Sequence, residues 1–421
     1  MKNKKILIIL IIAIVLILVA FIYNNTNKLK ELTTEEKLED FRYMYNIFEE
    51  NYPHFYEVRK LHGIDWLKYK EHFEDRIIKT ESNMEFFNEL NYTLSFLDDS
   101  HADVISPAFY YSYYSMFYDY RENKEDNDNI YKKLKPWIDI WLSAEKKYRD
   151  WYEVFKEEFP DEYKIELEEF SKSIDIDNVI TKIIEDEKIA YLKIKSFSID
   201  STEEIINFLK SVKDYPYLII DIMDNVGGND FYWNEMFLSL LNEDKKIENH
   251  YLVRGGEYLN QFLESELFSG FTKEDIDKCP YYDKLPKEIK KDFKYYISME
   301  HQLLSEHSIG FDGEVFLLVN EKNFSSADKL INNCKKADVA TVVGYTTNGG
   351  GIGVNPIFIS LPNSGLIVRF EGEMGFNEDG TSNFMGTKPD IEIEKIGGKN
   401  YNQKVIQETI NIIHSIEEEK R

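Results

Sequence analysis

The spacing of hydrophobic residues divides this chain into helical and α/β regions. Between residues 36 and 97, apolar and aromatic positions recur at helical intervals, which predicts a small helical subdomain over residues 35–105. Residues 107–173 contain no glycine and many Tyr, Phe and Trp residues separated by charges, so helices are also predicted there, within an insertion over residues 106–175. The aromatic positions of this insertion have two interpretations, a cap over substrate or ordinary helical packing.

From residue 178 onward, short apolar strands alternate with amphipathic helices. The predicted strands are 188–194, 217–223, 314–319 and 340–343, and the predicted helices are 203–212, 231–241 and 326–335. Because these strands are largely apolar, we expect a sheet covered on both faces, in an α/β core over residues 176–400. The stretch 251–307 is predicted as a helical insertion, and residues 401–421 as a closing amphipathic helix.

The first residues predict the location of the protein. Three lysines precede an uninterrupted apolar run from Ile6 to Tyr23, which is long enough to cross a membrane as a helix. Such lysines stay cytoplasmic, so the rest of the chain is expected outside the cytoplasmic membrane. A cleaved signal is the alternative, but the run ends without an Ala-x-Ala site, which favours an uncleaved anchor over residues 1–23. A polar linker, 24–34, follows and leads to a helix start near Thr33.

Composition limits the partners and the chemistry. A formal net charge of −26 argues against nucleic acid and anionic lipid, because phosphates would be repelled, and it also favours solubility. Cys279 and Cys334 are the only cysteines, and their pairing in an exported protein is left open. No Cys/His spacing typical of a metal site occurs, so no cofactor is predicted, and His301 and His307 are interpreted as surface residues.

The strongest candidate for chemistry follows the apolar strand 314–319. There the chain runs into Asn323 to Asp328, where a helix is predicted to begin, so Ser325 would lie at its first turn. Unpaired backbone N–H groups and the positive end of the helix dipole favour developing negative charge at such a position, as in an oxyanion hole. Helix capping by Ser and Asp is the simpler alternative.

Three other segments add candidate site residues. Gly227 and Gly228 follow an apolar run, and glycines there let backbone N–H groups approach a ligand closely. Ser100 and His101 lie between acidic residues at the end of a helical pattern, and residues 380–393 form a loop that leads into a strand. Taken singly, these segments have ordinary structural explanations: a turn, a solvated histidine and a loop.

In this order, the four segments resemble the family of serine peptidases that contains the C-terminal processing peptidases and the tricorn core protease. The matching segments are 221–228, 324–328, 343–351, 361–365 and 386–390. The resemblance covers residues 35–394 and implies a crotonase/ClpP-like α/β core with an N-terminal helical subdomain and helical insertions, preceded by one transmembrane helix. The PDZ domain that processing peptidases often carry is not implied, because residues 107–173 lack glycine-containing turns.

Two catalytic arrangements exist in that family, and the loop 348–353 distinguishes them. Processing peptidases place a lysine in this loop, whereas this sequence reads Asn-Gly-Gly-Gly-Ile-Gly, which excludes a Ser-Lys dyad at that position. The tricorn type places a His directly after a Ser, and Ser100-His101 matches that pair. The resemblance therefore implies Ser325 as nucleophile, His101 as general base and then acid, and Ser100 as a residue that orients the imidazole.

The resemblance also implies the remaining site residues. Backbone N–H groups of Ser326 and of Gly227 or Gly228 would form the oxyanion hole. The position of the tricorn glutamate holds Asn383, which can accept a hydrogen bond but has no charge to stabilise an imidazolium, and Glu378 or Asp379 could substitute for it. The predicted function is a membrane-anchored serine peptidase that acts outside the cytoplasmic membrane on peptides or unfolded protein tails.

Two other functions stay open at this point. A peptide-binding protein without turnover on the same fold would account for Asn383 and the missing lysine. Ser326 and Lys329 also have the Ser-x-x-Lys spacing of penicillin-binding proteins, which is compatible with an esterase-like hydrolase, although the chain contains no Lys-Thr-Gly strand.

Overall fold

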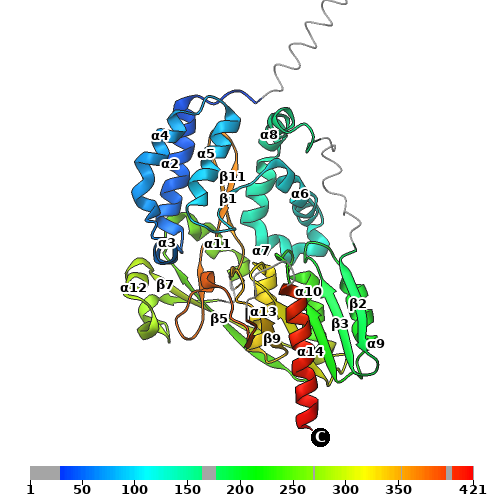
Figure 1. The fold of residues 1–421 in the computed structure, drawn as a ribbon. Helices are drawn as coiled ribbons and strands as arrows, with labels where there is room; N and C mark the ends of the chain where they lie inside the picture. The colour runs from blue at the N-terminus through cyan, green and yellow to red at the C-terminus, as the bar shows by residue number, and fades with distance from the viewer. Residues whose placement is uncertain (1–28, 164–176, 269–270, 352, 395–400, 421) are drawn as a thin grey trace, which may run out of the picture.

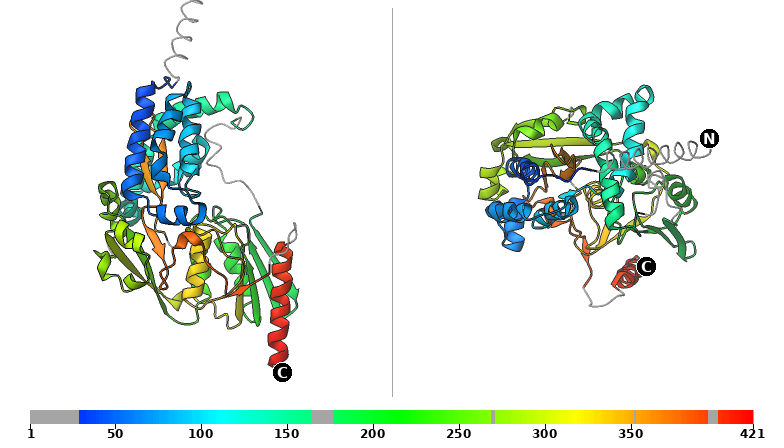
Figure 2. Two further views of the ribbon diagram at one scale, coloured as in Figure 1. Left: turned by 60° about the vertical axis from the view of Figure 1, so that its left-hand side comes forward. Right: turned by 90° about the horizontal axis from the view of Figure 1, so that it is seen from above.

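The computed structural model describes residues 29–163, 177–268, 271–351, 353–394 and 401–420 (Figure 1). A helical N-terminal half lies above an α/β half, and the C-terminal helix lies on the outside of the α/β half (Figures 1 and 2). The predicted anchor, 1–23, and most of the linker lie outside the described residues. Among the residues that are described, none of the helices combines the length and the apolar character needed to cross a membrane.

The first helices form where the sequence predicts them. They are α2 (Thr34–Asn51), α3 (Phe55–His62), α4 (Lys70–Ile78) and α5 (Asn83–Ser95), with a 3-10 turn, η1 (Trp66–Tyr69), between α3 and α4. Thr33 and Glu36 form a capping box at the start of α2, each side chain accepting a backbone N–H of the other residue. The aromatic stripe of α2 is core, since Phe41 and Phe48 are completely buried.

The glycine-free interval is also helical. It holds α6 (Pro107–Glu122), α7 (Lys124–Ser143) and α8 (Glu145–Glu158). Trp137 and Trp151 are buried, and their indole N–H groups donate to the carbonyls of Pro356 (2.8 Å) and Ser364 (3.0 Å). These aromatic residues belong to one core with α2–α5, which supports the packing interpretation rather than a substrate cap.

The α/β half contains a six-stranded sheet in the order β13-β9-β8-β4-β3-β2. Its strands are β2 (Val179–Glu185), β3 (Ile189–Ile194), β4 (Tyr217–Asp221), β8 (Glu314–Val319), β9 (Thr341–Gly344) and β13 (Ile391–Glu392). β2 pairs antiparallel with β3, and the other neighbours pair in parallel. Every strand predicted in this region is present, which confirms the mixed α/β class.

Helices cover both faces of this sheet (Figure 2). Leu218 and Ile220 of β4 pack against α9 (Thr202–Ser211), α10 (Phe231–Ser239) and α13 (Ser326–Lys336). The alternate residues of β4, Tyr217 and Ile219, point to the other face and pack against α14 (Tyr401–Glu419). The near-continuous apolar strands are explained by this double burial.

The prediction of a helical insertion at 251–307 is wrong. The region forms antiparallel strands β5 (Lys245–Val253), β6 (Thr272–Asp275) and β7 (Tyr295–Leu303), which join β12 (Met374–Phe376) in the order β12-β5-β7-β6. Its helices are short: α11 (Asn260–Leu263), α12 (Lys287–Asp292) and the turns η3 (Glu257–Leu259), η4 (Glu266–Phe268), η5 (Ile276–Lys278), η6 (Tyr282–Lys284) and η7 (Ser305–His307). β5 and β7 pair over nine residues each, and this long-range pairing outweighs local helical periodicity.

A small third sheet links the two halves of the molecule. It consists of β1 (Asp103–Val104), β11 (Ile367–Phe370) and β10 (Ile357–Ser360), all antiparallel. The turn between β10 and β11 is fixed on α2, because the backbone N–H groups of Asn363 and Ser364 each donate to the Asp40 carboxylate at 2.8 Å. The helical half thereby sets the position of β11, whose far end leads into the candidate site.

The structure also answers the questions left open by the cysteines. Cys279 and Cys334 are both free and buried, in two different hydrophobic clusters. Of the two histidines interpreted as surface residues, His307 is exposed and His301, in β7, is half-buried.

Candidate active site

Ser325 lies in a strained turn between β8 and α13. Its backbone has φ +54° and ψ −126°, a conformation that L-residues rarely adopt and that recurs at nucleophile turns. The turn is held by Asn323, whose side-chain amide donates to the carbonyls of Ile222 (2.6 Å) and Asn225 (3.0 Å). The Ser325 N–H donates to the Gly349 carbonyl at 2.9 Å. These bonds present the hydroxyl at the N-terminus of α13.

The imidazole of His101 meets this hydroxyl. His101 Nε2 lies 3.0 Å from Ser325 Oγ, although 224 residues separate them in sequence. On the other side of the ring, Nδ1 lies 2.7 Å from Oε1 of Glu371. His101 is only 6% exposed, so these contacts form away from bulk water. Hydroxyl, imidazole and carboxylate thus form the hydrogen-bonded series of a Ser-His-acid triad.

The pairing of β1 with β11 explains how His101 reaches Glu371. Asp103 is the partner of Arg369 and Val104 that of Val368, in antiparallel register. Continuing this register by two residues on each strand brings position 101 opposite position 371. Arg369 supports the alignment through an ion pair with Asp103 and a 3.3 Å hydrogen bond to the carbonyl of Ser100.

Glu371 is held as an anion between two histidines. Its second oxygen, Oε2, lies 2.7 Å from Nε2 of His54. Burial alone would raise the pKa of this carboxyl, but the hydrogen bonds and positive charge of His101 and His54 lower its pKa well below the usual range. An ionised carboxylate at Nδ1 is the form that orients the imidazole and stabilises an imidazolium.

The loop that lacks a lysine makes room for the imidazole. Gly350 has φ +72°, and a Cβ at this position would lie 2.7 Å from the Phe324 ring and 3.2 Å from Cε1 of His101. The Phe324 ring in turn packs on His101, with centroids 4.4 Å apart. Asp328 anchors the same loop by accepting the Gly351 N–H at 3.2 Å and a hydrogen bond from Thr347. A glycine is therefore required where the dyad peptidases would carry their lysine loop.

Backbone N–H groups beside Ser325 can form an oxyanion hole. The Gly227 N–H is occupied, since it donates to Asn225 Oδ1 at 2.9 Å. Phe197 and Gly228 form a β-bridge, in which the Phe197 N–H donates to the Gly227 carbonyl and the Asn229 N–H donates to the Phe197 carbonyl. The Gly228 N–H takes no part in this bridge. A Cβ on Gly227 would lie 3.0 Å from the Ser326 nitrogen, so the glycine pair is next to the start of α13. Ser326 and Gly228 are therefore the better donor pair.

The other predicted orienting residues lie beside this series rather than in it. Ser100 is exposed, and its carbonyl accepts from Arg369. Asn383 is buried at the start of the turn η8 (Asn383–Met385), with its backbone against Gly349. Glu378 and Asp379 are exposed. The carboxylate on Nδ1 is instead Glu371, which sequence reasoning missed; its signal was a charged residue directly after an apolar strand, but the partner strand was needed to interpret it.

The alternative Ser-x-x-Lys pair is engaged elsewhere. Ser326 Oγ donates to Asp230 Oδ1 at 2.5 Å and accepts from the Trp233 indole at 2.8 Å. Lys329 is paired with the other oxygen of the same carboxylate, at 2.7 Å. Ser326 is also buried, and the ion pair with Asp230 holds Lys329 in its charged form, which cannot act as a base.

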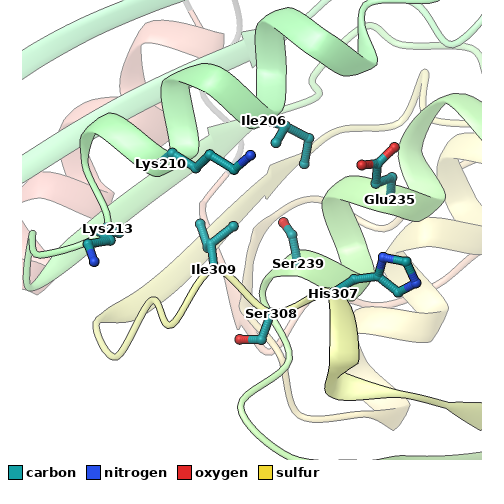
Figure 3. Close-up of a pocket in the computed structure, with 8 residues that line it drawn as sticks. All are labelled: Ile206, Lys210, Lys213, Glu235, Ser239, His307, Ser308 and Ile309. Carbon is teal, nitrogen blue, oxygen red and sulfur yellow. The ribbon is translucent and has the colours of Figure 1, made fainter.

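A surface hollow lies apart from these residues (Figure 3). Its lining comes from α9 and the turn after it, from α10, and from residues 307–309, and includes the exposed His307. The carboxylate and the imidazole that line it, Glu235 and His307, are not the groups that form hydrogen bonds with Ser325 and Glu371. We therefore assign the chemistry to the Ser325 turn.

The site consists of a strained serine at a helix start, hydrogen-bonded to an imidazole that is itself hydrogen-bonded to a carboxylate. This arrangement defines a serine hydrolase. Residues 188–393 match the model of peptidase family S41. Over these residues the chain is similar to peptidase family S41, and the Ser-His-acid site is that of a serine-type peptidase.

Solved structures share the fold over most of the chain. A protein described as a peptidase from Parabacteroides merdae has 19% identity and a TM-score of 0.55, and the match covers 90% of this chain and 96% of that one. Mature CPAF has 12% identity and a TM-score of 0.52, with the same coverage, 90% and 96%. No curated protein matches this sequence. At these identities the likeness concerns the fold alone.

Proposed function

We propose that this protein is a membrane-anchored serine peptidase that cleaves peptides or unfolded protein tails through an acyl-enzyme on Ser325. The observation that carries the proposal is the continuous hydrogen-bonded series from Ser325 through His101 to Glu371, with distances of 3.0 and 2.7 Å. A serine hydroxyl is too weakly acidic to attack at neutral pH without a base, and His101 is within hydrogen-bond reach.

The geometry supports a two-step reaction. Ser325 Oγ attacks the carbonyl carbon of the substrate while its proton passes to His101 Nε2, and the new oxyanion accepts N–H bonds from Ser326 and Gly228. His101 then gives the proton to the leaving amine, the C–N bond breaks, and an acyl-enzyme remains. A water deprotonated by His101 attacks this ester and restores the free hydroxyl. Throughout, Glu371 keeps the ring in position and stabilises the imidazolium.

The sequence pattern supports a location outside the cytoplasmic membrane. The apolar run from Ile6 to Tyr23 would anchor the chain as a single span, with the preceding lysines inside and the peptidase domain outside. The largely parallel sheet with helices on both faces is compatible with the crotonase/ClpP-like core that we propose for residues 176–400. The acidic surface makes peptides and proteins, rather than nucleic acids, the proposed substrates.

Hydrolysis of a mixed peptide library by the full chain tests the activity. We expect new peptide termini with the wild type and none with Ser325→Ala or His101→Ala. Cleavage that persists in Ser325→Ala would reject the assignment of the nucleophile. Binding of peptides without any cleavage would instead favour the non-catalytic alternative, and cleavage that depends on Lys329 would favour the Ser-x-x-Lys alternative.

The location is tested separately by membrane fractionation and by adding protease to intact cells from outside. The proposal predicts that the full-length chain sediments with membranes and is degraded by the added protease. Recovery of the chain in the soluble fraction after lysis would contradict the proposal. So would a chain that the added protease cannot degrade in intact cells but does degrade once the cells are lysed.

A further inference from the structure

A second histidine contacts the carboxylate of the proposed triad. His54 lies at the N-terminus of α3, is completely buried, and approaches Glu371 Oε2 with its Nε2 at 2.7 Å. The two oxygens of Glu371 are thus divided between two imidazoles, His101 on Oε1 and His54 on Oε2. The mechanism described above uses only the first of these contacts.

The far side of the His54 ring faces another buried carboxylate. His54 Nδ1 lies 4.0 Å from Glu57 Oε2, and neither atom has a hydrogen-bond partner in the described part of the chain. Glu57 is 3% exposed, and burial raises the pKa of its carboxyl. Burial by itself would lower the pKa of His54, but the hydrogen bond and charge of Glu371, followed by the charge of Glu57, raise it.

The remaining surroundings of His54 favour its charged form. Carboxylates act on it from three directions: Glu57 from α3, Asp99 from the segment before His101, and Glu371 with Glu373 from the chain after β11. The uncharged neighbours are the rings of Phe384, with centroids 4.6 Å apart, and Tyr52, at 5.7 Å in an edge contact. Two nearby cations, Lys60 and Lys329, act on Glu57 and Glu373. The interaction that most favours an imidazolium at His54 is therefore its contact with Glu371, the neighbouring carboxyl whose pKa is lowered.

We propose that His54 is a positioning residue of the peptidase, an imidazolium that fixes the carboxylate plane of Glu371 and sets the proton affinity of the Glu371–His101 pair. This inference rests on the proposed function. Two hydrogen bonds on two oxygens hold a carboxylate more firmly than one, so Oε1 stays directed at His101 Nδ1. The positive charge of His54 also makes it harder to add a proton to the neighbouring pair, which extends the active pH range to lower pH.

The test measures the rate of reaction with a fluorophosphonate probe as a function of pH, with the purified full chain. In this reaction the Ser325 Oγ–P bond forms, the P–F bond breaks and fluoride leaves, while the serine proton passes to His101, so no peptide substrate is needed. The variants are His54→Gln, whose amide can still donate to Glu371 but has no charge, and His54→Phe, which has neither property. His250→Gln is the matched control, because His250 is also buried but lies in β5, where its Nδ1 is 2.9 Å from the Tyr296 hydroxyl.

In the plot of reaction rate against pH, we expect the maximal rate of His54→Gln to be about tenfold lower than that of the wild type. We also expect the acidic limb, where the rate falls at low pH, to move to higher pH by about 0.5 to 1 unit. His54→Phe should lose about 100-fold, because the second oxygen of Glu371 is left unpaired in a buried site. His250→Gln should keep the wild-type limb. Thermal unfolding of each variant gives the folded fraction, so that lost rate is compared per folded molecule.

An unchanged acidic limb in His54→Gln would overturn the inference, whether its rate is normal or falls only with the folded fraction. Ser325→Ala is measured in parallel. If probe reaction survives in Ser325→Ala, the proposed function fails; if it is abolished there but is insensitive to His54, only the role of His54 fails.

Discussion

Asp103 and Arg369 face each other across β1 and β11, and their ion pair lies two residues from the contact between His101 and Glu371. Both side chains are partly exposed, so the pair itself contributes little to overall stability. Its importance is geometric, because a strand of only two residues depends on few bonds to keep its register. The base and its carboxylate are aligned by this short strand pairing.

We predict that Arg369→Met lowers the probe reaction rate about tenfold while the melting temperature changes little, because the bonds to Asp103 and to the Ser100 carbonyl are both lost. The measurement is the rate of fluorophosphonate reaction together with thermal unfolding. Arg149→Met removes an ion pair with Glu145 on α8 and is the control, expected to leave the rate unchanged. Equal rates in the two variants would show that the Arg369 pair does not align the site.

Glu371→Gln should be the most damaging isosteric change at the site. The amide keeps the size of the side chain but removes the charge that stabilises the imidazolium, and it leaves His54 without its anion. We expect kcat for a cleaved peptide to fall about 10³-fold with KM changed much less. Glu378→Gln, on an exposed residue seven positions later, should have normal kinetics. A Glu371→Gln enzyme with near wild-type kcat would remove this carboxylate from the mechanism.

Gly350→Ala tests the space that the glycine loop leaves for the imidazole. The new Cβ would lie 2.7 Å from the Phe324 ring and 3.2 Å from His101, so we expect an activity loss of about tenfold or more. Gly310→Ala separates this contact from backbone strain, because Gly310 has a similar φ of +69° and nothing within 4 Å of its Cβ position. Both variants should lose about 1 kcal/mol of stability from strain, and only Gly350→Ala should lose activity beyond that.

The buried carboxyl of Glu373 should make the stability of the protein depend on pH. Burial raises its pKa from 4.5 to about 7, with the charge of Glu371 as a further cause, and Oε1 accepts the Val354 N–H at 2.6 Å. At pH values between 4.5 and about 7, Glu373 holds a proton in the folded protein that it has lost in the unfolded chain. The free energy of unfolding therefore falls as the pH rises through this range.

In Glu373→Gln the amide oxygen can still accept from Val354, but the titration is gone. The loss of unfolding free energy between pH 5 and pH 8, measured in denaturant, should therefore be smaller than in the wild type by about 1 kcal/mol or more. Glu288→Gln, on an exposed residue of α12, should retain the wild-type dependence. The same slope in Glu373→Gln and wild type would contradict the assignment.

The sequence patterns correctly predicted the elements that are determined by interactions between residues close together in the chain. Strands such as Glu314–Val319 are apolar because both faces of the sheet are covered, and the turn at Ser325 follows from a strand that runs into a helix. The proximity of His101 to Ser325 was expected from an ordered set of motifs, and the structure brings the two side chains together.

Features that depend on long-range pairing were missed. β5 and β7 are strands because they pair with each other, and Lys245–Val253 carries no clear alternation of its own. Glu371 reaches His101 only through the register of β1 with β11, which joins segments 270 residues apart. His54 lies among the aromatic residues of a helical region, where nothing local marks it as a neighbour of Glu371.

The proposed function depends most on Ser325 as the nucleophile and His101 as its base. The most direct test is to react the full chain with a serine-directed phosphonate and to locate the adduct by mass spectrometry. We predict one adduct, on the peptide that contains Ser325, absent in Ser325→Ala and at least about 10³-fold slower to form in His101→Ala. An adduct on Ser326, or one that still forms in Ser325→Ala, would show that Ser325 is not the nucleophile.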